Sequence, residues 1–260
     1  MKKIHFLLCF AFGLFNCQTP KPNKKESILV VFAHADDETT MGSVLAKYGQ
    51  TYDVQLVLAT DGRYGTTAHA GIPAGDSLIA VRQLEAVCSC EKLGIKTPIF
   101  LGLQDGFGLN GRGNFYEEIP KLRTKLVNLI QETQPTKIIT FGPDGDTGHP
   151  DHRLIGGLTT EILLRKNLVD QIDLYYFGWT KSQAEKYHWW ELNYVNEAVL
   201  NTVISYTDMD KAKAIESIRC YKSQYTEAEM TKWAAAEKKD TINRLYFRKF
   251  VVDKTQRTTF

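Results

Sequence analysis

Apolar runs alternate with amphipathic segments along most of the chain. Residues 27–33 are continuously apolar and rich in β-branched side chains, which is typical of a strand buried on both faces. Apolar residues at helical spacing follow and stop at Gly49. The same alternation predicts further strands over residues 54–60, 98–103, 137–141, 174–177 and 245–252, and further helices over residues 78–93, 119–130, 154–169 and 210–221. This order predicts an α/β fold: a Rossmann-like, open, mainly parallel sheet with helices on both faces, in a single domain over residues 27–260.

Residues 1–26 follow a different pattern. Two lysines precede an apolar run of about 12 residues, which is typical of a secretory signal peptide and shorter than the roughly 20 residues of a membrane-spanning helix. Residues 14–17 resemble a bacterial lipobox, in which the cysteine, here Cys17, is acylated, although Asn16 stands where a small residue is usual. Residues 18–26 are polar and predict a tether.

Residues 1–17 are therefore expected to be a signal peptide with a candidate lipobox. The protein is expected to be exported and held by an N-terminal lipid to a membrane, facing the periplasm or the exterior of a bacterial cell. The alternatives are ordinary signal cleavage without a lipid and a segment that is retained.

The composition excludes some classes of protein. The chain is 43% hydrophobic and 24% charged, which is typical of a globular protein rather than a disordered one. It has 32 Lys and Arg residues against 30 Asp and Glu residues, a formal net charge of +2. Since this balance provides no polybasic face, we expect no nucleic-acid partner.

The five cysteines predict no disulfide framework. Cys9 and Cys17 belong to the expected signal peptide, and the odd number of three remains. Cys88 and Cys90 lie two positions apart in a predicted helix, so their side chains point about 200° apart and cannot share a metal ion. They are expected to be small buried residues.

Histidines and acidic residues follow two of the predicted buried strands. In open α/β sheets the ligand crevice lies beyond the carboxyl ends of the strands, so these residues are candidates for chemistry. A catalytic zinc site needs three ligands of the His and carboxylate type and one open position. The candidates are His34, Asp36 and Asp37 after the first strand, and His149, Asp151 and His152 after the strand at residues 137–141. Of these, His34, Asp37 and His152 would supply the three ligands for one divalent ion.

Two other histidines are weaker candidates. His188 and Glu191 have the same spacing as His34 and Asp37 but follow no buried strand, so we interpret them as structural or as part of a cleft rim. His69 lies among glycine and threonine and is expected to be exposed to solvent.

Two elements of the sequence resemble a known family. Residues 33–38 (AHADDE) and 148–152 (GHPDH) are similar to the AHPDDE and GHPDH elements of the PIG-L/LmbE-like zinc-dependent N-acetylglucosaminyl deacetylases. Ala35 stands where the family usually has proline, which affects the stiffness of the turn more than its chemistry. Weaker matches lie at residues 60–62, 78–86, 101–106 and 222–224, so the resemblance covers most of residues 27–225.

The resemblance implies an enzyme that hydrolyses the N-acetyl amide of an N-acetylglucosamine-type sugar or glycoconjugate with one Zn²⁺ ion. It implies zinc ligands His34, Asp37 and His152. Asp36 would be the general base, a protonated His149 would stabilise the oxyanion, and Asp151 would orient His149. Arg82 and Asp105 would contact sugar hydroxyls. General chemistry agrees, since a metal-bound water needs a neighbouring carboxylate that is not itself a ligand.

Two alternatives are open. Two histidines and one carboxylate also form the iron site of non-haem oxygenases, for which His149, Asp151 and a distant histidine would be the ligands. Those enzymes usually have all-β barrels, which the alternation of strands and helices opposes. The other alternative is a non-catalytic, lipid-anchored sugar-binding protein, which would be expected to have lost Asp36 or a metal ligand.

Overall fold

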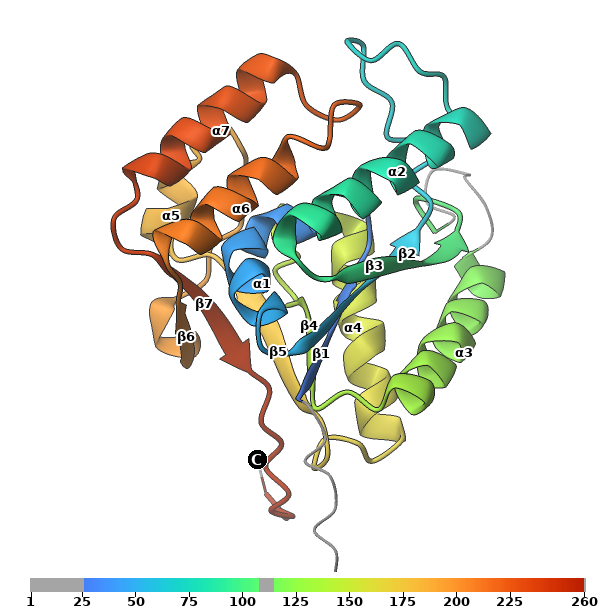
Figure 1. Ribbon diagram of the computed structural model, residues 1–260. Coiled ribbons are helices and arrows are strands. Elements are labelled where there is room, and N and C mark those ends of the chain that lie inside the picture. Colours follow the sequence, from blue (N-terminus) through green and yellow to red (C-terminus); the bar gives the residue numbers. More distant parts are fainter. Residues whose placement is uncertain (1–25, 108–114, 260) are drawn as a thin grey trace, which may run out of the picture.

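A single twisted sheet of seven strands forms the centre of the molecule (Figure 1). The computed structural model describes residues 26–107 and 115–259, so the expected signal peptide, Cys17 and nearly all of the tether lie outside the described residues. The strand order is β3-β2-β1-β4-β5-β7-β6. Within the described part of the chain, no helix has the length and apolar character needed to cross a membrane.

The sheet is mainly parallel, as the sequence predicts. The strands from β1 to β5 run parallel to their neighbours, whereas β7 pairs antiparallel with both β5 and β6. The strands are β1 Ser27–Phe32, β2 Asp53–Thr60, β3 Lys96–Leu103, β4 Lys137–Phe141, β5 Asp173–Gly178, β6 Thr202–Ser205 and β7 Arg244–Lys249.

Seven helices and two short 3-10 segments accompany the strands in the described residues. The helices are α1 Gly42–Gly49, α2 Asp76–Leu93, α3 Phe115–Thr133, α4 Pro150–Arg165, α5 Lys181–Lys186, α6 Asp208–Ile218 and α7 Glu227–Lys239. The 3-10 segments are Asp37–Met41 and Glu197–Val199. The sequence analysis did not predict α5, α7 or β6.

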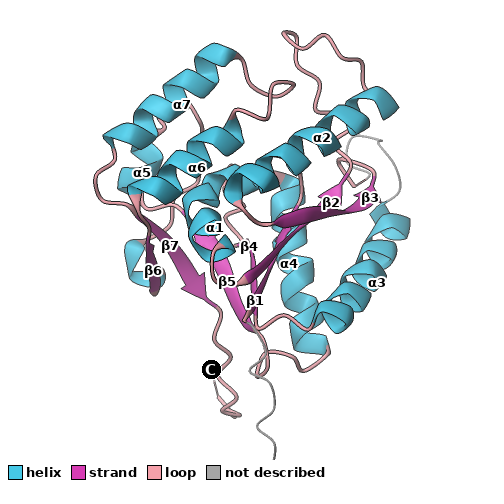
Figure 2. Cartoon of the chain, viewed as in Figure 1, coloured by secondary structure: helices cyan, strands magenta, loops and turns pink. Residues whose placement is uncertain are grey.

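Helices cover both faces of the sheet, and β1 contributes to the core on each side (Figure 2). Its residues alternate: Val30 and Phe32 pack on the face covered by α1, α2 and α6, while Leu29 and Val31 pack on the face covered by α3 and α4. Because both faces are buried, the strand needs the continuous apolar run that its sequence has.

Helix α4 lies very close to β4. A Cβ atom at Gly156 would stand 2.1 Å from the carbonyl oxygen of Phe141, so only glycine permits this approach. The helix begins at Pro150 rather than at the predicted Leu154, because His149 caps it and proline suits the first helical position. The GHPDH element therefore forms the cap and the first turn of this helix.

Cys88 and Cys220 form a disulfide, with their Cα atoms 5.8 Å apart. This corrects the prediction that the cysteines after residue 17 are all unpaired. The pairing arises because α2 and α6 pack against each other and bring the end of α6 next to Cys88. Cys90 is free and buried, as predicted for that residue.

Candidate active site and metal centre

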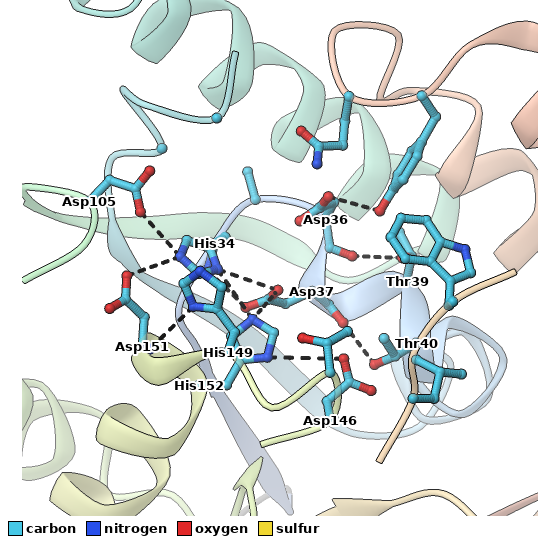
Figure 3. A pocket seen from close by; sticks show the side chains of 18 of the residues that line it. His34, Asp36, Asp37, Thr39, Thr40, Asp105, Asp146, His149, Asp151 and His152 are labelled. Atoms are coloured by element: carbon cyan, nitrogen blue, oxygen red, sulfur yellow. Dashed lines mark hydrogen bonds and ion pairs between the residues drawn. The ribbon is translucent and has the colours of Figure 1, made fainter. Parts of the chain in front are cut away.

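A cavity of about 580 Å³ opens where the parallel strands end. Its walls come from the segments that follow all five parallel strands, including the turn after β1 and the start of α4 (Figure 3). Strand β1 is also where the chain order reverses, since β2 lies on one side of it and β4 on the other. Such a switch point is the usual position of a ligand site in open α/β sheets.

The turn after β1 is held by the carboxylate of Asp37. Its Oδ2 atom accepts hydrogen bonds from the backbone N–H groups of Ala33 (3.0 Å) and His34 (2.8 Å). This leaves Oδ1 to face the histidines across the cavity. The turn also places Asp36 at a φ of 106°, which costs free energy for a non-glycine residue and is often found at functional sites.

Glu38 stabilises the same turn from within the protein core. It is fully buried and accepts hydrogen bonds from Ser89, from the hydroxyl of Tyr221 (2.6 Å) and from the backbone N–H of Asp36 (3.3 Å). Burial raises the pKa of Glu38 to about 7. These contacts fix the turn although Ala35 replaces the family's proline.

Three donor atoms converge at one side of the cavity. His34 Nδ1 lies 3.2 Å from His152 Nε2, His152 Nε2 lies 3.1 Å from Asp37 Oδ1, and His34 Nδ1 lies 3.7 Å from Asp37 Oδ1. We call these three atoms the donor triangle. Ligand atoms of a tetrahedral zinc site stand about 3.3 Å from one another, since each lies about 2.0 Å from the metal. The donor triangle therefore fits a small divalent ion.

The other nitrogen of each histidine in the donor triangle has an acceptor of its own. His34 Nε2 lies 3.2 Å from Asp151 Oδ2 and 3.2 Å from Asp105 Oδ1, and His152 Nδ1 lies 3.0 Å from the carbonyl oxygen of Gly145. Such acceptors hold the proton on the distal nitrogen and leave the facing nitrogen free to bind a metal. Figure 3 shows Asp105 and Asp151 on the side of His34 away from Asp37.

The charges of these groups depend on one another. Burial would raise the pKa of Asp37, but the imidazoles of His152 and His34 hold it well below its usual range. Burial would lower the pKa of His34, but the carboxylates of Asp37, Asp105 and Asp151 raise it well above its usual range. The cluster thus favours a carboxylate at Asp37, the form that binds metal ions.

The position of Asp151 differs from its expected role. Its Oδ2 accepts from the backbone N–H of Gly106 (3.0 Å) and faces His34, while its own backbone N–H donates to Nδ1 of His149 (3.2 Å). The main chain of residue 151 therefore orients His149, and its carboxylate orients His34. Partial burial and the imidazoles of His34 and His152 also lower the pKa of His149, which opposes the protonated form expected from the sequence.

Asp36 lies beside the donor triangle and is not part of it. Its Oδ2 accepts a hydrogen bond from the hydroxyl of Tyr225 (2.9 Å) and stands 4.0 Å from Nη1 of Arg82. Burial raises the pKa of Asp36 to about 6. Arg82 is itself buried and donates to the carbonyl of Gly65 (3.0 Å), although its side chain reaches the cavity.

Several residues of the cavity were missed from the sequence. Asp146 is buried against His152 Nδ1 (4.0 Å) and accepts a hydrogen bond from Trp179, and burial raises its pKa to about 7. Its position just before the GHPDH element could have identified it as a candidate from the sequence. Aromatic side chains also line the cavity, namely Trp179, Tyr187, Trp190, Tyr225 and Trp233. Of these, only Tyr225 follows directly on a motif that the sequence analysis identified, at residues 222–224.

The two weaker histidine candidates lie at the periphery. His69 is exposed, and its Nε2 lies 3.0 Å from the carbonyl oxygen of Lys222. Glu191 lines the cavity whereas His188 is exposed and is not among the described residues that line it, which agrees with a position at the cleft rim.

Comparisons with known proteins point to one family. The family model described as GlcNAc-PI de-N-acetylase (PIG-L) matches residues 29–163. A 1D-myo-inositol 2-acetamido-2-deoxy-alpha-D-glucopyranoside deacetylase 2 from Catenulispora acidiphila is 31% identical over 147 residues, which are 50% of this chain and 48% of that protein. A probable N-acetyl-alpha-D-glucosaminyl L-malate deacetylase 2 from Bacillus cereus is 32% identical over 132 residues, 50% of this chain and 57% of that protein. The chain thus spans about half the length of these curated relatives.

Solved structures share the fold at low sequence identity. An N,N'-diacetylchitobiose deacetylase from Pyrococcus horikoshii has a TM-score of 0.63 and 21% identity, covering 86% of this chain and 84% of that one. A 4-carboxy-2-hydroxymuconate hydratase from Pseudomonas putida has a TM-score of 0.61 and 17% identity, covering 90% and 100%. Because proteins of different activity share this fold, the fold alone does not decide the reaction. The match over residues 29–163 includes both halves of the donor triangle, and the chain belongs to the PIG-L family.

Proposed function

We propose that the protein hydrolyses the N-acetyl amide of an N-acetylglucosamine-type sugar or glycoconjugate and uses one divalent ion, Zn²⁺, to do so. The observation that carries this proposal is the donor triangle of His34, Asp37 and His152 next to a carboxylate, Asp36, that is not part of it. The named activities of the relatives from Catenulispora acidiphila and Bacillus cereus support the choice of an amino-sugar amide.

His34, Asp37 and His152 would hold the ion. When bound, the ion lowers the pKa of a water molecule to about 7 and polarises the acetyl carbonyl. Asp36 is placed to accept the proton of the attacking water, because its carboxylate borders the cavity and is held in place by Tyr225. After the amide bond breaks, Asp36 can return that proton to the leaving amine.

His149 is placed to stabilise the oxyanion as a neutral donor. Its Nδ1 accepts the backbone N–H of Asp151, so the single proton of the neutral ring lies on Nε2. A fixed N–H donor that faces developing negative charge lowers the barrier without changing its own protonation state. Asp151 and Asp105 would act on the metal ligand His34. Asp105 and Arg82 also line the cavity, so contacts with sugar hydroxyls remain part of the proposal.

Specific observations oppose the two alternatives. An iron oxygenase would need His149 as a ligand, but Nδ1 of this ring already accepts a hydrogen bond from the backbone N–H of Asp151. The open, mainly parallel sheet also differs from the all-β barrels of those enzymes. A sugar-binding protein without activity would not need Asp36, which is present and is held beside the donor triangle by two neighbours.

The direct test measures acetate release from N,N'-diacetylchitobiose by the metal-loaded protein. Asp36→Asn keeps the shape of the side chain and removes the base, so the rate should fall by about two to four orders of magnitude. The bound metal, measured by mass spectrometry, should stay at one ion per chain. Asp170→Asn is the matched control, because this aspartate is exposed and, among the residues that the structure describes, pairs with one surface lysine, Lys254.

Two outcomes would contradict these assignments. Loss of the metal from a folded Asp36→Asn variant would make Asp36 a ligand. No acetate release from any N-acetylglucosamine compound by the metal-loaded wild-type protein would refute the proposed activity.

We also propose that the protein is exported and attached to a membrane through an acylated Cys17. The sequence pattern of residues 1–17 supports this, and so does the disulfide between Cys88 and Cys220, because such bonds persist in oxidising compartments outside the cytoplasm.

A further inference from the structure

Three aromatic side chains that line the cavity lie close to one another. We call Trp190, Tyr225 and Trp233 the aromatic wall. The ring centroids of Trp190 and Tyr225 are 5.9 Å apart, those of Trp190 and Trp233 are 6.4 Å apart, and those of Tyr225 and Trp233 are 6.2 Å apart. Trp190 and Trp233 are only partly buried and line the cavity, so part of each side chain is available to a ligand.

The aromatic wall begins at the reaction centre. Tyr225 donates a hydrogen bond from its hydroxyl to Asp36, the proposed base, and its ring lies nearly perpendicular to that of Trp190. When the acetamido group of a substrate lies at the donor triangle, a group attached to its sugar ring can therefore reach the aromatic wall. The wall also lies outside residues 29–163, the part that the family model matches.

The charges around the wall oppose an anionic group. Arg82 is the single lysine or arginine among the described residues that line the cavity, and its guanidinium is buried against Gly65 and Asp36. Glu191, next to Trp190, adds an exposed carboxylate. A carboxylate or phosphate bound at the aromatic wall would lose hydration, and the one cationic side chain among these lining residues, Arg82, already faces Asp36, so binding of an anion is unfavourable.

One polar group at this side of the cavity needs a donor. Gln224 lines the cavity next to Tyr225, and its Oε1 atom is buried without a hydrogen-bond partner among the described residues. A buried acceptor without a partner costs free energy that a ligand hydroxyl would recover. An uncharged ring with apolar faces and hydroxyl edges satisfies both the aromatic wall and Gln224.

Building on the proposed function, we propose that the aromatic wall binds a second, uncharged sugar ring linked to the N-acetylglucosamine unit. The substrate class is then a neutral N-acetylglucosamine-containing oligosaccharide. A conjugate of the amino sugar with an acidic group is disfavoured at this wall.

The test compares three substrates with the metal-loaded protein: N,N'-diacetylchitobiose, free N-acetylglucosamine and N-acetylglucosaminyl malate. Trp190→Ala should lower kcat/KM for the disaccharide about tenfold, mainly through KM, and leave the monosaccharide nearly unchanged, because only the second ring stacks on Trp190. Trp189→Ala is the matched control. Trp189 is the neighbouring residue, packs against Lys232 and is not among the described residues that line the cavity.

Equal losses on the disaccharide and the monosaccharide would overturn the inference and leave the deacetylase proposal standing. A preference of the wild-type protein for the malate conjugate would overturn it too. A second measurement is independent of turnover: calorimetric binding of N,N'-diacetylchitobiose to Asp36→Asn, with and without Trp190→Ala. If the added Trp190→Ala substitution weakens binding, the result supports a second sugar ring at the aromatic wall even if the wild-type protein releases no acetate. Unchanged binding refutes this proposal.

Discussion

His149 and the two histidines of the donor triangle present different groups of the imidazole to the cavity. For His34 and His152, carboxylate or carbonyl acceptors hold the distal N–H, so a lone pair faces the donor triangle. For His149, a backbone N–H occupies the lone pair of Nδ1, so an N–H group is left for the cavity. Neutral histidine has one donor and one acceptor, and the local contacts decide which of them reaches the substrate.

The metal-binding role of His152 is testable by its removal. His152→Ala deletes one corner of the donor triangle, and two remaining donors hold an ion poorly, so the purified variant should contain almost no metal. Metal content per chain measured by mass spectrometry checks this. His188→Ala, at an exposed histidine outside the cavity lining, should keep one ion. Full occupancy in folded His152→Ala would refute the ligand assignment.

Replacement of Asp151 tests whether its carboxylate supports metal binding by His34. Asp151→Asn keeps the backbone N–H that orients His149 but weakens the acceptor that faces His34 Nε2, so metal affinity should fall about 10-fold to 100-fold. Competition with a chelator measures this affinity, and Asp170→Asn again serves as the control. If Asp151→Asn lowered activity without changing affinity, the carboxylate would act on His149 after all.

The sequence predicts the residues of the donor triangle better than it predicts the residues that contact the site. His34, Asp37 and His152 follow strand ends, and the ends of adjacent parallel strands meet, so their convergence could be predicted. The contact of Asp151 with His34 depends on where α4 starts and how its first turn is oriented. Tyr225 reaches Asp36 from 189 residues away, a contact set by packing rather than by local pattern.

Helix α4 positions the second half of the site through its contact with β4. Replacing Gly156 with alanine puts a methyl group where the Phe141 carbonyl oxygen stands, so the helix must shift. We expect Gly156→Ala to lose about 1–3 kcal/mol of unfolding free energy and to bind metal more weakly, because the shift carries His152 with it. Chemical denaturation and chelator competition measure the two effects.

Gly157 provides the control for this helix. A Cβ atom there would meet nothing within 4 Å, so Gly157→Ala should be neutral or stabilising, since alanine favours helix. If Gly156→Ala were as stable and as well metallated as Gly157→Ala, the close approach of α4 to β4 would not position the site.

The sequence pattern predicted the elements that have a long apolar run or stripe and missed those that have none. Strand β1 and helix α3 bury long apolar stretches or stripes, so their periodicity is plain. Helix α7 buries only Met230, Ala234 and Ala236, and α5 and β6 are short, so none of the three has a strong period. Their capping residues, such as Thr226 before α7, were the remaining signal.

At the scale of the whole molecule, two parts of the chain together form the lining of the cavity. The residues matched by the family model supply the donor triangle, Asp36 and His149, and the segments after β5 supply the aromatic wall. The disulfide from Cys88 to Cys220 ties α2 to the chain just before Tyr225, so it joins these parts covalently. The mainly parallel sheet could be predicted from the alternation of elements, whereas the disulfide could not, because a cysteine count contains no distances.

The cellular position of the whole molecule is tested at Cys17. If Cys17 is acylated, the mature wild-type protein should be found in membrane fractions and its N-terminal peptide should carry added acyl mass. Cys17→Ser should move the protein to soluble extracts or leave the signal uncleaved. Cys90→Ser, at a free cysteine in the core, is the control for loss of a thiol. An unmodified N-terminus beyond residue 17 in the wild-type protein would refute the lipid anchor and leave export standing.

The distance along the chain between the donor atoms has a thermodynamic consequence. His34 and His152 are 118 residues apart in sequence, so an unfolded chain would have to close a long loop to bring them together. An ion held by the donor triangle therefore binds the native state almost exclusively, and its binding free energy adds to the stability of the fold. At a free ion concentration 100 times the Kd this linkage contributes about 2.7 kcal/mol. The melting temperature of the protein should then follow the metal supply of the compartment in which it works.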